Sequence, residues 1–388
     1  MSITHKKHLY VAVLLLSVIG VFCIYGWYIK SQDAHVLAQS ITQGSIQPAV
    51  QTPKSLQFTV VGDIMAHRPL VQSVYDSSTK QYDFSSILHP VVQYLTGDIV
   101  LGNMETPVAG DEKGFPGYPM FNAPVAYLSA LRGTGFTHLS VSNNHSLDQH
   151  FSGLQDTVYN ITRQGMVPIG FRDTPNDYHI TSITTPTGMR VGMFAGSYGF
   201  NGFQLPTDQE HTLMNYSENE LLEIETEINN RKNEFDVLIA YLHIGYEYKM
   251  TQNTEQENIA QRLCDAGVRI IIMSHPHVLQ PMEYLESTTG QSCLVAYSMG
   301  NFLANPNNER KYTDLGGILQ VQVIEDKDST ALNIQPIFIP TVINRSTIDK
   351  KLYYQIEPLN RSQKHSWMSD EKWQGYVREV SKIVEKIK

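Results

Sequence analysis

The sequence is poor in cysteine, with only three in 388 residues. Cys23 falls inside a long apolar run near the N-terminus, whereas Cys264 and Cys293 have the neighbours expected of buried strand or helix positions. Three cysteines, one of them in a separate segment, cannot form a closed disulfide framework. The sequence therefore does not indicate a disulfide-rich scaffold.

A basic stripe is also absent. The 29 lysines and arginines are outnumbered by 38 acidic residues, and the net charge of −9 is spread along the chain. Nucleic acid is not an expected partner, because proteins that bind it gather Lys and Arg on one face. We find no internal repeat and no low-complexity tract. The three tryptophans form no aromatic cluster that would suggest a sugar-binding platform.

The N-terminal apolar run lacks a cleavage site. Residues 9–29 carry no charge, and at about 1.5 Å per residue a helix of this length crosses a hydrocarbon core of roughly 30 Å. The run ends in bulky aromatic residues rather than a small-x-small exit, so we expect a retained single-pass signal anchor. Lys6 and Lys7 favour a cytoplasmic location for residues 1–8 and an extracytoplasmic body attached to the cell membrane.

A linker, a large domain and a tail are expected after the anchor. Residues 30–55 are rich in Gln, Ser, Thr and Ala without a sustained period, which indicates a linker. We assign residues 56–345 to one α/β domain and residues 346–388 to a C-terminal extension. The extension has a strand-like patch followed by a helix over residues 370–387, either a solvated surface helix or one that docks a partner.

Strand and helix patterns alternate along the large domain. Apolar runs predict strands at residues 58–61, 98–102, 136–141, 191–195, 236–242, 268–272 and 294–297. Helices are predicted at residues 153–164, 221–232 and 255–266. In the last of these, Thr254 and Glu257 are expected to form a capping box, and Gly267 to end the helix. The alternation predicts an α/β fold of β-sheets flanked by helices.

One predicted strand leads directly into two histidines. Residues 268–272 are mostly β-branched, as in a fully buried strand. His275 and His277 follow and flank Pro276, which fixes its own φ and favours an extended backbone at His275. By itself the pair is equally consistent with a turn that carries two incidental histidines.

Ligand-type side chains recur just past the ends of several predicted strands. In open α/β sheets, sites form outside the carboxyl ends of the strands. Carboxylate, carboxamide and imidazole groups gathered there suit one or two Mn, Fe or Zn ions. Turn formation accounts for any one of these residues, but poorly for three strand ends that carry histidine. The set comprises Asp63, Glu105, Asn144, His145, His243, His275, His277 and Asn301.

Six stretches together resemble one protein family. They are residues 61–65, 98–105, 142–148, 243–247, 274–280 and 297–302, in family order over residues 58–305. On these motifs the chain resembles the CapA/PgsA family of bacterial capsule synthesis proteins, whose domain resembles the calcineurin-like metallophosphoesterase fold. The resemblance implies a metallophosphoesterase-like layered sandwich for residues 56–345. The anchor and linker resemble those of the membrane-bound poly-γ-glutamate members.

The resemblance also assigns roles to individual residues. It implies metal ligation by Asp63, Asn144, His243, His275 and His277. Glu105 lies near the bridging acid of phosphoesterases, with Asn103 as the other candidate. His145 matches the histidine that polarises the scissile phosphate, and would be the catalytic residue.

Four further residues are expected to support the ligands: Asn103, Asp148, Glu247 and Asn301. Two of them have structural alternatives. Asp148 is better explained by starting or bracing the helix that follows it. Glu247 is equally well explained by packing against a neighbouring loop.

One position departs from the phosphoesterase pattern. Phosphoesterases have Asp-x-His at the end of the first strand, whereas here the third residue is Met65, a poor ligand for a hard ion. His67 follows closely. The departure weakens the case for two-metal chemistry, which needs both ions in place.

Two functions of different kinds remain open. The first is a membrane-anchored component of a capsule machine for poly-γ-glutamate or a related anionic polymer, working with other membrane proteins of a synthesis or export complex. The second is a cell-surface metal-dependent phosphoesterase in which His145 stabilises developing charge. Met65 favours the first, and the number of ligand-type residues that remain favours a site that still binds metal.

Overall fold

The computed structural model describes residues 53–307, 309–326 and 331–387. The predicted membrane anchor and most of the predicted linker lie outside these residues. Within the described part of the chain, no helix combines the length and the apolar character needed to cross a membrane.

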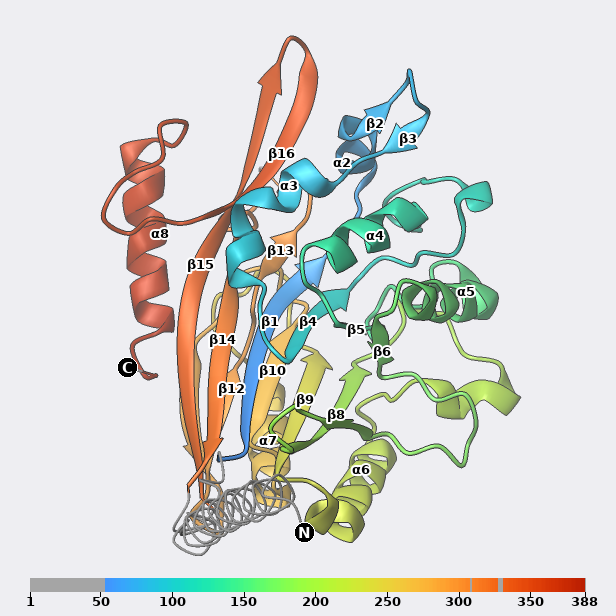
Figure 1. Cartoon of the computed structure of the whole chain (residues 1–388), viewed down its shortest axis with the longest axis vertical. Helices are drawn as coiled ribbons and strands as arrows, with labels where there is room; N and C mark the ends of the chain where they lie inside the picture. The colour runs from blue at the N-terminus through green and yellow to red at the C-terminus, as the bar shows by residue number, and fades with distance from the viewer. Residues whose placement is uncertain (1–52, 308, 327–330, 388) are drawn as a thin grey trace, which may run out of the picture. The chain divides into compact units, whose positions relative to one another are not determined.

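The described residues form a mixed α/β fold with two main sheets (Figure 1). The larger sheet is parallel from β1 to β6 and antiparallel from β1 to β16. In spatial order it contains β16 (Lys351–Pro358), β15 (Leu332–Ile348), β14 (Leu315–Glu325), β1 (Ser55–Ile64), β4 (Ile99–Met104), β5 (His138–Ser140) and β6 (Val167–Ile169), with β13 (Asn301–Leu303) paired to β1.

The smaller sheet has a parallel centre and antiparallel edges. Its strands are β11 (Met282–Glu286), β12 (Ser292–Ala296), β10 (Ile270–Ser274), β9 (Val237–His243), β8 (Arg190–Ser197) and β7 (Thr181–Thr184); β2 (Tyr75–Asp76) and β3 (Gln81–Tyr82) form a separate hairpin. The α-helices are α2 (Arg68–Ser73), α3 (Ser85–Leu88), α4 (Val125–Gly133), α5 (His150–Arg163), α6 (Glu218–Arg231), α7 (Thr254–Ala266) and α8 (Asp370–Ile383).

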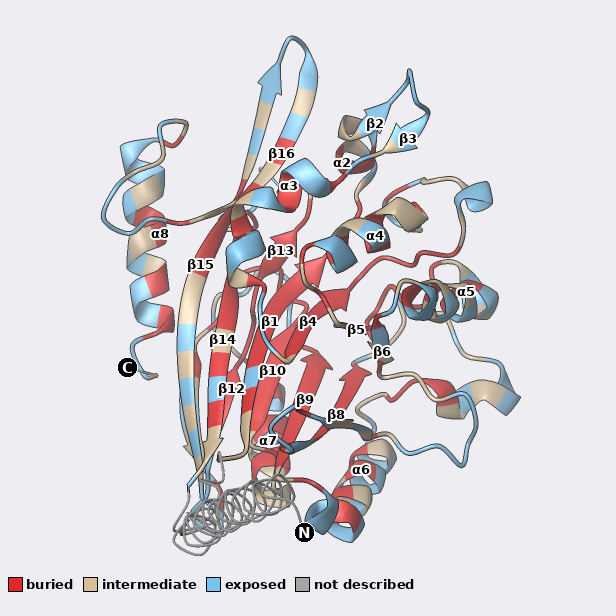
Figure 2. Cartoon of the chain, in the orientation of Figure 1, coloured by how far each residue is buried: buried red, intermediate tan, exposed pale blue. Residues whose placement is uncertain are grey.

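The two sheets share one core, and helices cover their other faces. In β9, Ile239 and Tyr241 belong to the same apolar cluster as Phe58 of β1. Ala240, between them, points the other way and belongs to a second cluster with Leu221 of α6. Successive side chains of a strand alternate between its faces, so strands buried on both sides read as continuous apolar runs. Figure 2 shows the central strands buried along most of their length and the helices exposed on one side.

The strands and helices predicted within residues 58–297 all occur, with shifts at their ends. The capping box of α7 lies one residue earlier than expected. Asn253, not Thr254, caps the helix and exchanges hydrogen bonds with Gln256, and Gly267 ends it as predicted. Gln256 takes this position because its side chain is also held in the interior by Gln280 and by the carbonyl of Tyr297.

The tail after residue 345 is continuous with the rest of the fold, which corrects the boundary we placed there. That boundary falls inside β15, and β16 extends the same sheet. Helix α8 also packs on the shared core through Tyr376, Val380 and Ile383. It is held to the body by the ion pair from Lys372 to Asp314, whose atoms are 2.6 Å apart. The helix is therefore not free on all sides.

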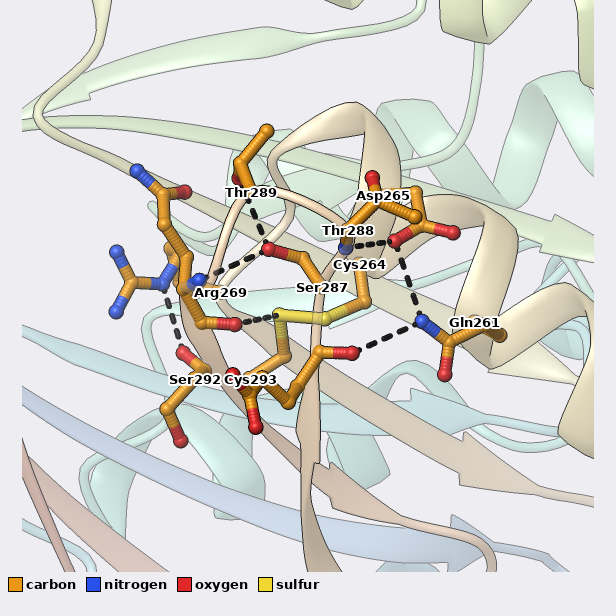
Figure 3. Close-up of a disulfide and its surroundings, with 11 residues drawn as sticks. Gln261, Cys264, Asp265, Arg269, Ser287, Thr288, Thr289, Ser292 and Cys293 are labelled. Carbon is orange, nitrogen blue, oxygen red and sulfur yellow. Dashed lines mark hydrogen bonds between the residues drawn. A yellow bond between two sulfur atoms is a disulfide. The ribbon is translucent and has the colours of Figure 1, made fainter.

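A disulfide joins Cys264 of α7 to Cys293 of β12 (Figure 3). Both residues are buried, as the sequence indicated, but their pairing was not predicted. Their Cα atoms are 5.9 Å apart across a sequence separation of 29 residues. The bond ties the helix that covers the smaller sheet to a strand of that sheet.

Candidate metal centre

Ligand-type side chains from both sheets meet at the carboxyl ends of their parallel strands. Asp63 is the penultimate residue of β1, Glu105 follows β4, and His243 ends β9. All three side chains are fully buried. His275 and His277 follow β10 and are also buried. The β1–β4 and β9–β10 pairs are parallel, which brings these strand ends to the same edge of each sheet.

These five residues form two groups that share Glu105. Asp63, Glu105 and His243 place one ligand atom each within 4.8 Å of one another, and so do Glu105, His275 and His277. Glu105 Oε1 lies 3.4 Å from His243 Nε2 and 3.8 Å from His277 Nε2. Imidazole and carboxylate groups in this number and spacing fit a divalent transition-metal ion.

The buried polar atoms of the cluster support that fit. Neither carboxylate oxygen of Glu105 has a hydrogen-bond partner, and neither does Nδ1 of His275. Buried polar groups in native proteins are nearly always paired, because an unpaired one costs free energy. A cation held by Glu105 and the histidines would satisfy these atoms, so the residues present suit a metal ion.

The charges of the cluster are strongly coupled. Burial by itself raises the pKa of Asp63, but the hydrogen bond with His277 and the charges of His277 and His243 outweigh it, and the pKa is lowered. Burial, followed by the charge of Asp63, raises the pKa of Glu105 well above its usual value. A cation would displace a proton from Glu105, because carboxylates bind metal in their ionised form.

The histidines titrate differently from one another. Burial lowers the pKa of His275 to about 3 and that of His243 well below its ordinary value. Burial also lowers the pKa of His277, but contacts with Asp63 outweigh this effect and raise it. His243 and His275 are therefore neutral near pH 7, which is the form that ligates metal.

The loop after β10 departs from the extended backbone expected before Pro276. His275 has a φ of 105° and His277 a φ of 57°, a region that costs non-glycine residues about 1–3 kcal/mol each. Two contacts to Asp63 Oδ2 hold the loop there: the His275 N–H at 3.4 Å and His277 Nδ1 at 3.1 Å. The strand must turn sharply to bring both histidines to the buried carboxylate, and these contacts offset the strain.

Three asparagines connect the ligands. Asn103 donates to Asp63 Oδ1 at 2.9 Å and lies 3.1 Å from His243 Nδ1. Asn144 Oδ1 is 2.9 Å from His243 Nε2, and Asn301 Oδ1 is 3.1 Å from His277 Nδ1. Asn103 and Asn301 therefore each contact a ligand-type side chain, and the supporting roles expected for them stay predictions. Asn144 contacts a ligand-type histidine and lies beside the cluster.

His145 stands next to the cluster and is held by Asp148. The two side chains meet at 2.8 Å, between His145 Nδ1 and Asp148 Oδ2. Asp148 Oδ2 also accepts the backbone N–H of Phe121, whose ring packs edge-on against His145. Asp148 thus orients the imidazole and fastens the loop at Phe121, whereas the helix that follows has Gln149 as its N-cap and no side-chain cap.

A cavity of about 600 Å³ opens beside the cluster. It is lined by His145 and His277 from the site and by Met65 and His67 from the segment after β1. Glu247 is exposed at this cavity, outside the buried groups. Residues of the lining that the sequence did not single out include Asn305 and Arg345.

Residues missed by the sequence analysis make some of the closest contacts in the site. Asn143 donates to Asn103 Oδ1 at 3.0 Å, Ser274 Oγ lies 3.1 Å from His243 Nδ1, and Asn201 contacts Asn144 at 3.2 Å. Asn143 and Ser274 adjoin predicted ligands, so proximity in sequence was the available signal. No signal in the sequence marked Asn201, because it lies in a loop 57 positions after Asn144, the residue that it contacts.

Met65 and His67 do not join either ligand group. Met65 is buried at the end of the cavity, and its thioether is a poor donor to a hard ion. His67 Nδ1 accepts the N–H of Asn305 at 3.3 Å, and its ring packs against Phe121. His67 therefore lines the cavity and does not replace the histidine that Met65 removes.

Comparison with known proteins identifies the family of this chain. The model of the family described as bacterial capsule synthesis protein PGA_cap matches residues 57–306, a stretch that contains every ligand-type residue described above. The capsule biosynthesis protein CapA of Bacillus anthracis is 26% identical over 312 residues, which cover 78% of this chain and 72% of that protein.

A second capsule protein and one solved structure are also similar to this chain. The PGA biosynthesis protein CapA of Bacillus subtilis (strain 168) is 28% identical over 266 residues, or 64% of this chain and 63% of that protein. A crystal structure of TT1561 from Thermus thermophilus aligns with 73% of this chain and 98% of its own at 9% identity, with a TM-score of 0.37, from which we infer nothing. Because the family model spans most of the chain, this protein belongs to the PGA_cap family of bacterial capsule synthesis proteins.

Proposed function

We propose that this protein acts in making or exporting poly-γ-glutamate, or a related anionic surface polymer, through a buried divalent metal centre. The observation that carries the proposal is Glu105, which is fully buried, lacks hydrogen-bond partners and is shared by two groups of ligand-type side chains. Family membership supports capsule biosynthesis, and the relative named for PGA biosynthesis supports this polymer.

The proposed centre holds one or two Mn, Fe or Zn ions. Asp63 and His243 would hold an ion on one side of Glu105, and His275 and His277 on the other. Such an ion supplies a Lewis acid that attracts carboxylate or phosphate oxygens. Asn103 and Asn301 keep the ligands oriented through the contacts described above. We propose that this arrangement belongs to a metallophosphoesterase-type domain.

The cavity beside the centre suits an anionic chain. Arg345 lies in its lining, and its Nη1 donates to Asn305 Oδ1 at 3.3 Å. A polymer with regularly spaced carboxylates has one group for the metal centre and others for Arg345. Tyr118, 77% exposed, adds an open aromatic surface at the same cavity. Glu247 and Glu309 in the same lining repel carboxylates, so the proposed preference for a carboxylate polymer rests on the metal ion and Arg345.

We further propose that the body lies outside the cytoplasm. The Cys264–Cys293 disulfide supports this location, because such bonds persist in oxidising compartments. The uncharged run at residues 9–29 would anchor the chain in the cell membrane, and residues 30–55 would hold the body away from it. Other membrane components of a capsule complex are the partners this placement suits.

A cell-surface phosphoesterase is the second candidate. The observation that favours it is His145, which Asp148 orients at the cavity beside the ligand groups. In that function the imidazole donates to charge that develops on a phosphate, and losing such a donor typically costs about 10²–10³ in rate.

Paired measurements on the same variants separate the two functions. Surface polymer is measured on cells that carry Glu105→Gln, His145→Ala or the exposed-site control His89→Ala, and hydrolysis of a generic phosphodiester is measured on each purified full-length protein. The capsule function predicts loss of polymer in Glu105→Gln, nearly normal polymer in His145→Ala and no hydrolysis above background.

Other results would overturn this preference. Robust hydrolysis that disappears in His145→Ala, together with loss of polymer in that variant, would show that the protein acts as a phosphoesterase and that polymer production depends on this activity. A normal amount of surface polymer in Glu105→Gln would show that polymer production does not depend on the metal centre. The His89→Ala control should match the unaltered protein in both measurements.

A further inference from the structure

A second group of ligand-type side chains lies between α6 and the segment that precedes β7. His179 comes two residues before β7, and Glu220 and Glu223 are three residues apart on α6. Residues at this spacing share one face of a helix. The three side chains place one ligand atom each within 4.8 Å of one another, and none belongs to the centre described above.

Two buried atoms distinguish this group from an ordinary acidic surface. The His179 side chain is only 7% exposed, and its Nε2 has no hydrogen-bond partner although it lies 3.8 Å from Glu223 Oε2. Glu220 Oε2 is also buried and unpaired. Leaving two such atoms unsatisfied side by side is costly, so the geometry indicates a group that would engage both.

The backbone around His179 is fixed from the other side. Glu227 of α6 accepts the N–H of His179 at 2.9 Å and that of Ile180 at 3.1 Å. Arg231 then donates to Glu227 at 2.8 Å, and its guanidinium lies 3.8 Å from the centre of the Tyr178 ring. These contacts hold the backbone of His179 against α6, and its Nε2 lies near Glu220 and Glu223.

The protonation states suit a cation. Burial lowers the pKa of His179 to about 4, so its imidazole is neutral near pH 7. Burial, and then the charge of Glu223, raises the pKa of Glu220. The positive charge of Arg172 lowers the pKa of Glu220 and so opposes both of these effects. Arg172 is held by another contact, because its Nε donates to the backbone carbonyl of His211 at 2.7 Å.

We propose that His179, Glu220 and Glu223 form a second divalent-cation site, for an ion of the zinc class, that fastens the segment before β7 to α6. One imidazole and two carboxylates match zinc better than calcium, which takes six to eight oxygen ligands. A cleft of about 640 Å³ beside Glu223 and His179 gives the ion access from solvent. The ion would coordinate both unpaired atoms, His179 Nε2 and Glu220 Oε2.

Zinc binding to the metal-stripped full-length protein in mild detergent tests this site. His179→Gln, Glu220→Gln and Glu223→Gln should each weaken one zinc equivalent by at least about tenfold, since even residues that only support a ligand typically contribute 10–100-fold. Glu223 is 62% exposed, so its variant keeps the fold. The matched controls are Glu255→Gln, in the first turn of α7, and the exposed-site variant His89→Gln.

A positional measurement completes the test. Crystals grown with zinc should show an anomalous peak between His179 and the two glutamates, absent in the His179→Gln protein. Equal zinc affinity in all variants and controls, or no peak at His179, would overturn the proposal. The outcome is independent of the metal centre at Glu105, because the two sites share no residue.

Discussion

His277 Nδ1 lies 3.1 Å from Asp63 Oδ2, although Asp63 belongs to a strand of the larger sheet, His277 follows a strand of the smaller one, and the two are 214 positions apart. This contact joins the carboxyl end of β1 to the loop after β10. It brings the two ligand groups together around Glu105, and it helps to hold both histidines in their positive-φ conformation.

Metal should stabilise the fold through the centre at Glu105. At a free concentration one hundred times the dissociation constant, Mn²⁺ should add about 2.7 kcal/mol to the free energy of unfolding. The melting temperature of the full-length protein is measured with Mn²⁺ and with excess chelator, in a His179→Gln background so that the second site does not contribute. Glu105→Gln, which removes the carboxylate shared by both ligand groups, should abolish the difference, and His89→Ala should keep it. An unchanged melting curve on protein shown to contain metal would contradict ligation by these residues.

The body should be accessible from outside the cytoplasmic membrane. The apolar run at residues 9–29 is long enough to span the membrane and lacks an exit site, so the chain should stay attached. Protease added to intact spheroplasts should digest residues 56–388, while a cytoplasmic marker protein survives. Protection of the body, or its release as a mature soluble protein, would contradict the anchor.

The Cys264–Cys293 disulfide should contribute substantially to stability. Closing a loop of this length restricts the unfolded chain, and its loss should lower the free energy of unfolding by about 3 kcal/mol. The double variant Cys264→Ala/Cys293→Ala is compared with Cys23→Ala by denaturant unfolding. Cys23→Ala should leave the midpoint unchanged and remain sensitive to reductant, whereas the double variant should be insensitive. Equal midpoints would show that the bond adds nothing to the fold.

His138 should destabilise the fold as the pH falls. Burial in β5 lowers its pKa from 6.5 to about 4, so the unfolded chain takes up this proton first. Between these two values stability falls with decreasing pH, and above 6.5 the effect vanishes. At pH 4.5 the loss should be roughly 2–3 kcal/mol.

The His138 effect is measured as a difference between proteins. Unfolding free energies of the unaltered protein and of His138→Gln are compared from pH 7.5 to pH 4.5. Their difference should change by the stated amount in favour of the variant, whereas His89→Gln should follow the unaltered protein. Parallel curves for His138→Gln would show that this imidazole titrates normally in the fold.

The strands that hold the centre were predictable because their signals are local. A strand buried on both faces is apolar along its buried part, so the stretches 237–242 and 270–272 within the predicted strands stand out without knowledge of their neighbours. The polar residues that follow such strands fall at the carboxyl ends of a parallel sheet by topology alone. For this reason Asp63, His243 and His275 were assigned to one site, and the structure brings them together.

Only the tertiary structure decided which side chains touch. The sharing of Glu105 between two groups, the orientation of His145 by Asp148 and the pairing of Cys264 with Cys293 depend on distances between elements. The bend at His275 reversed a local preference, because two contacts with buried Asp63 outweigh the cost of a positive φ. The sequence by itself determined the kinds of ligand and the strand ends that carry them, through periodicity and residue chemistry. Long-range packing and hydrogen bonding determined their partners, because those energies arise only when distant segments are buried together.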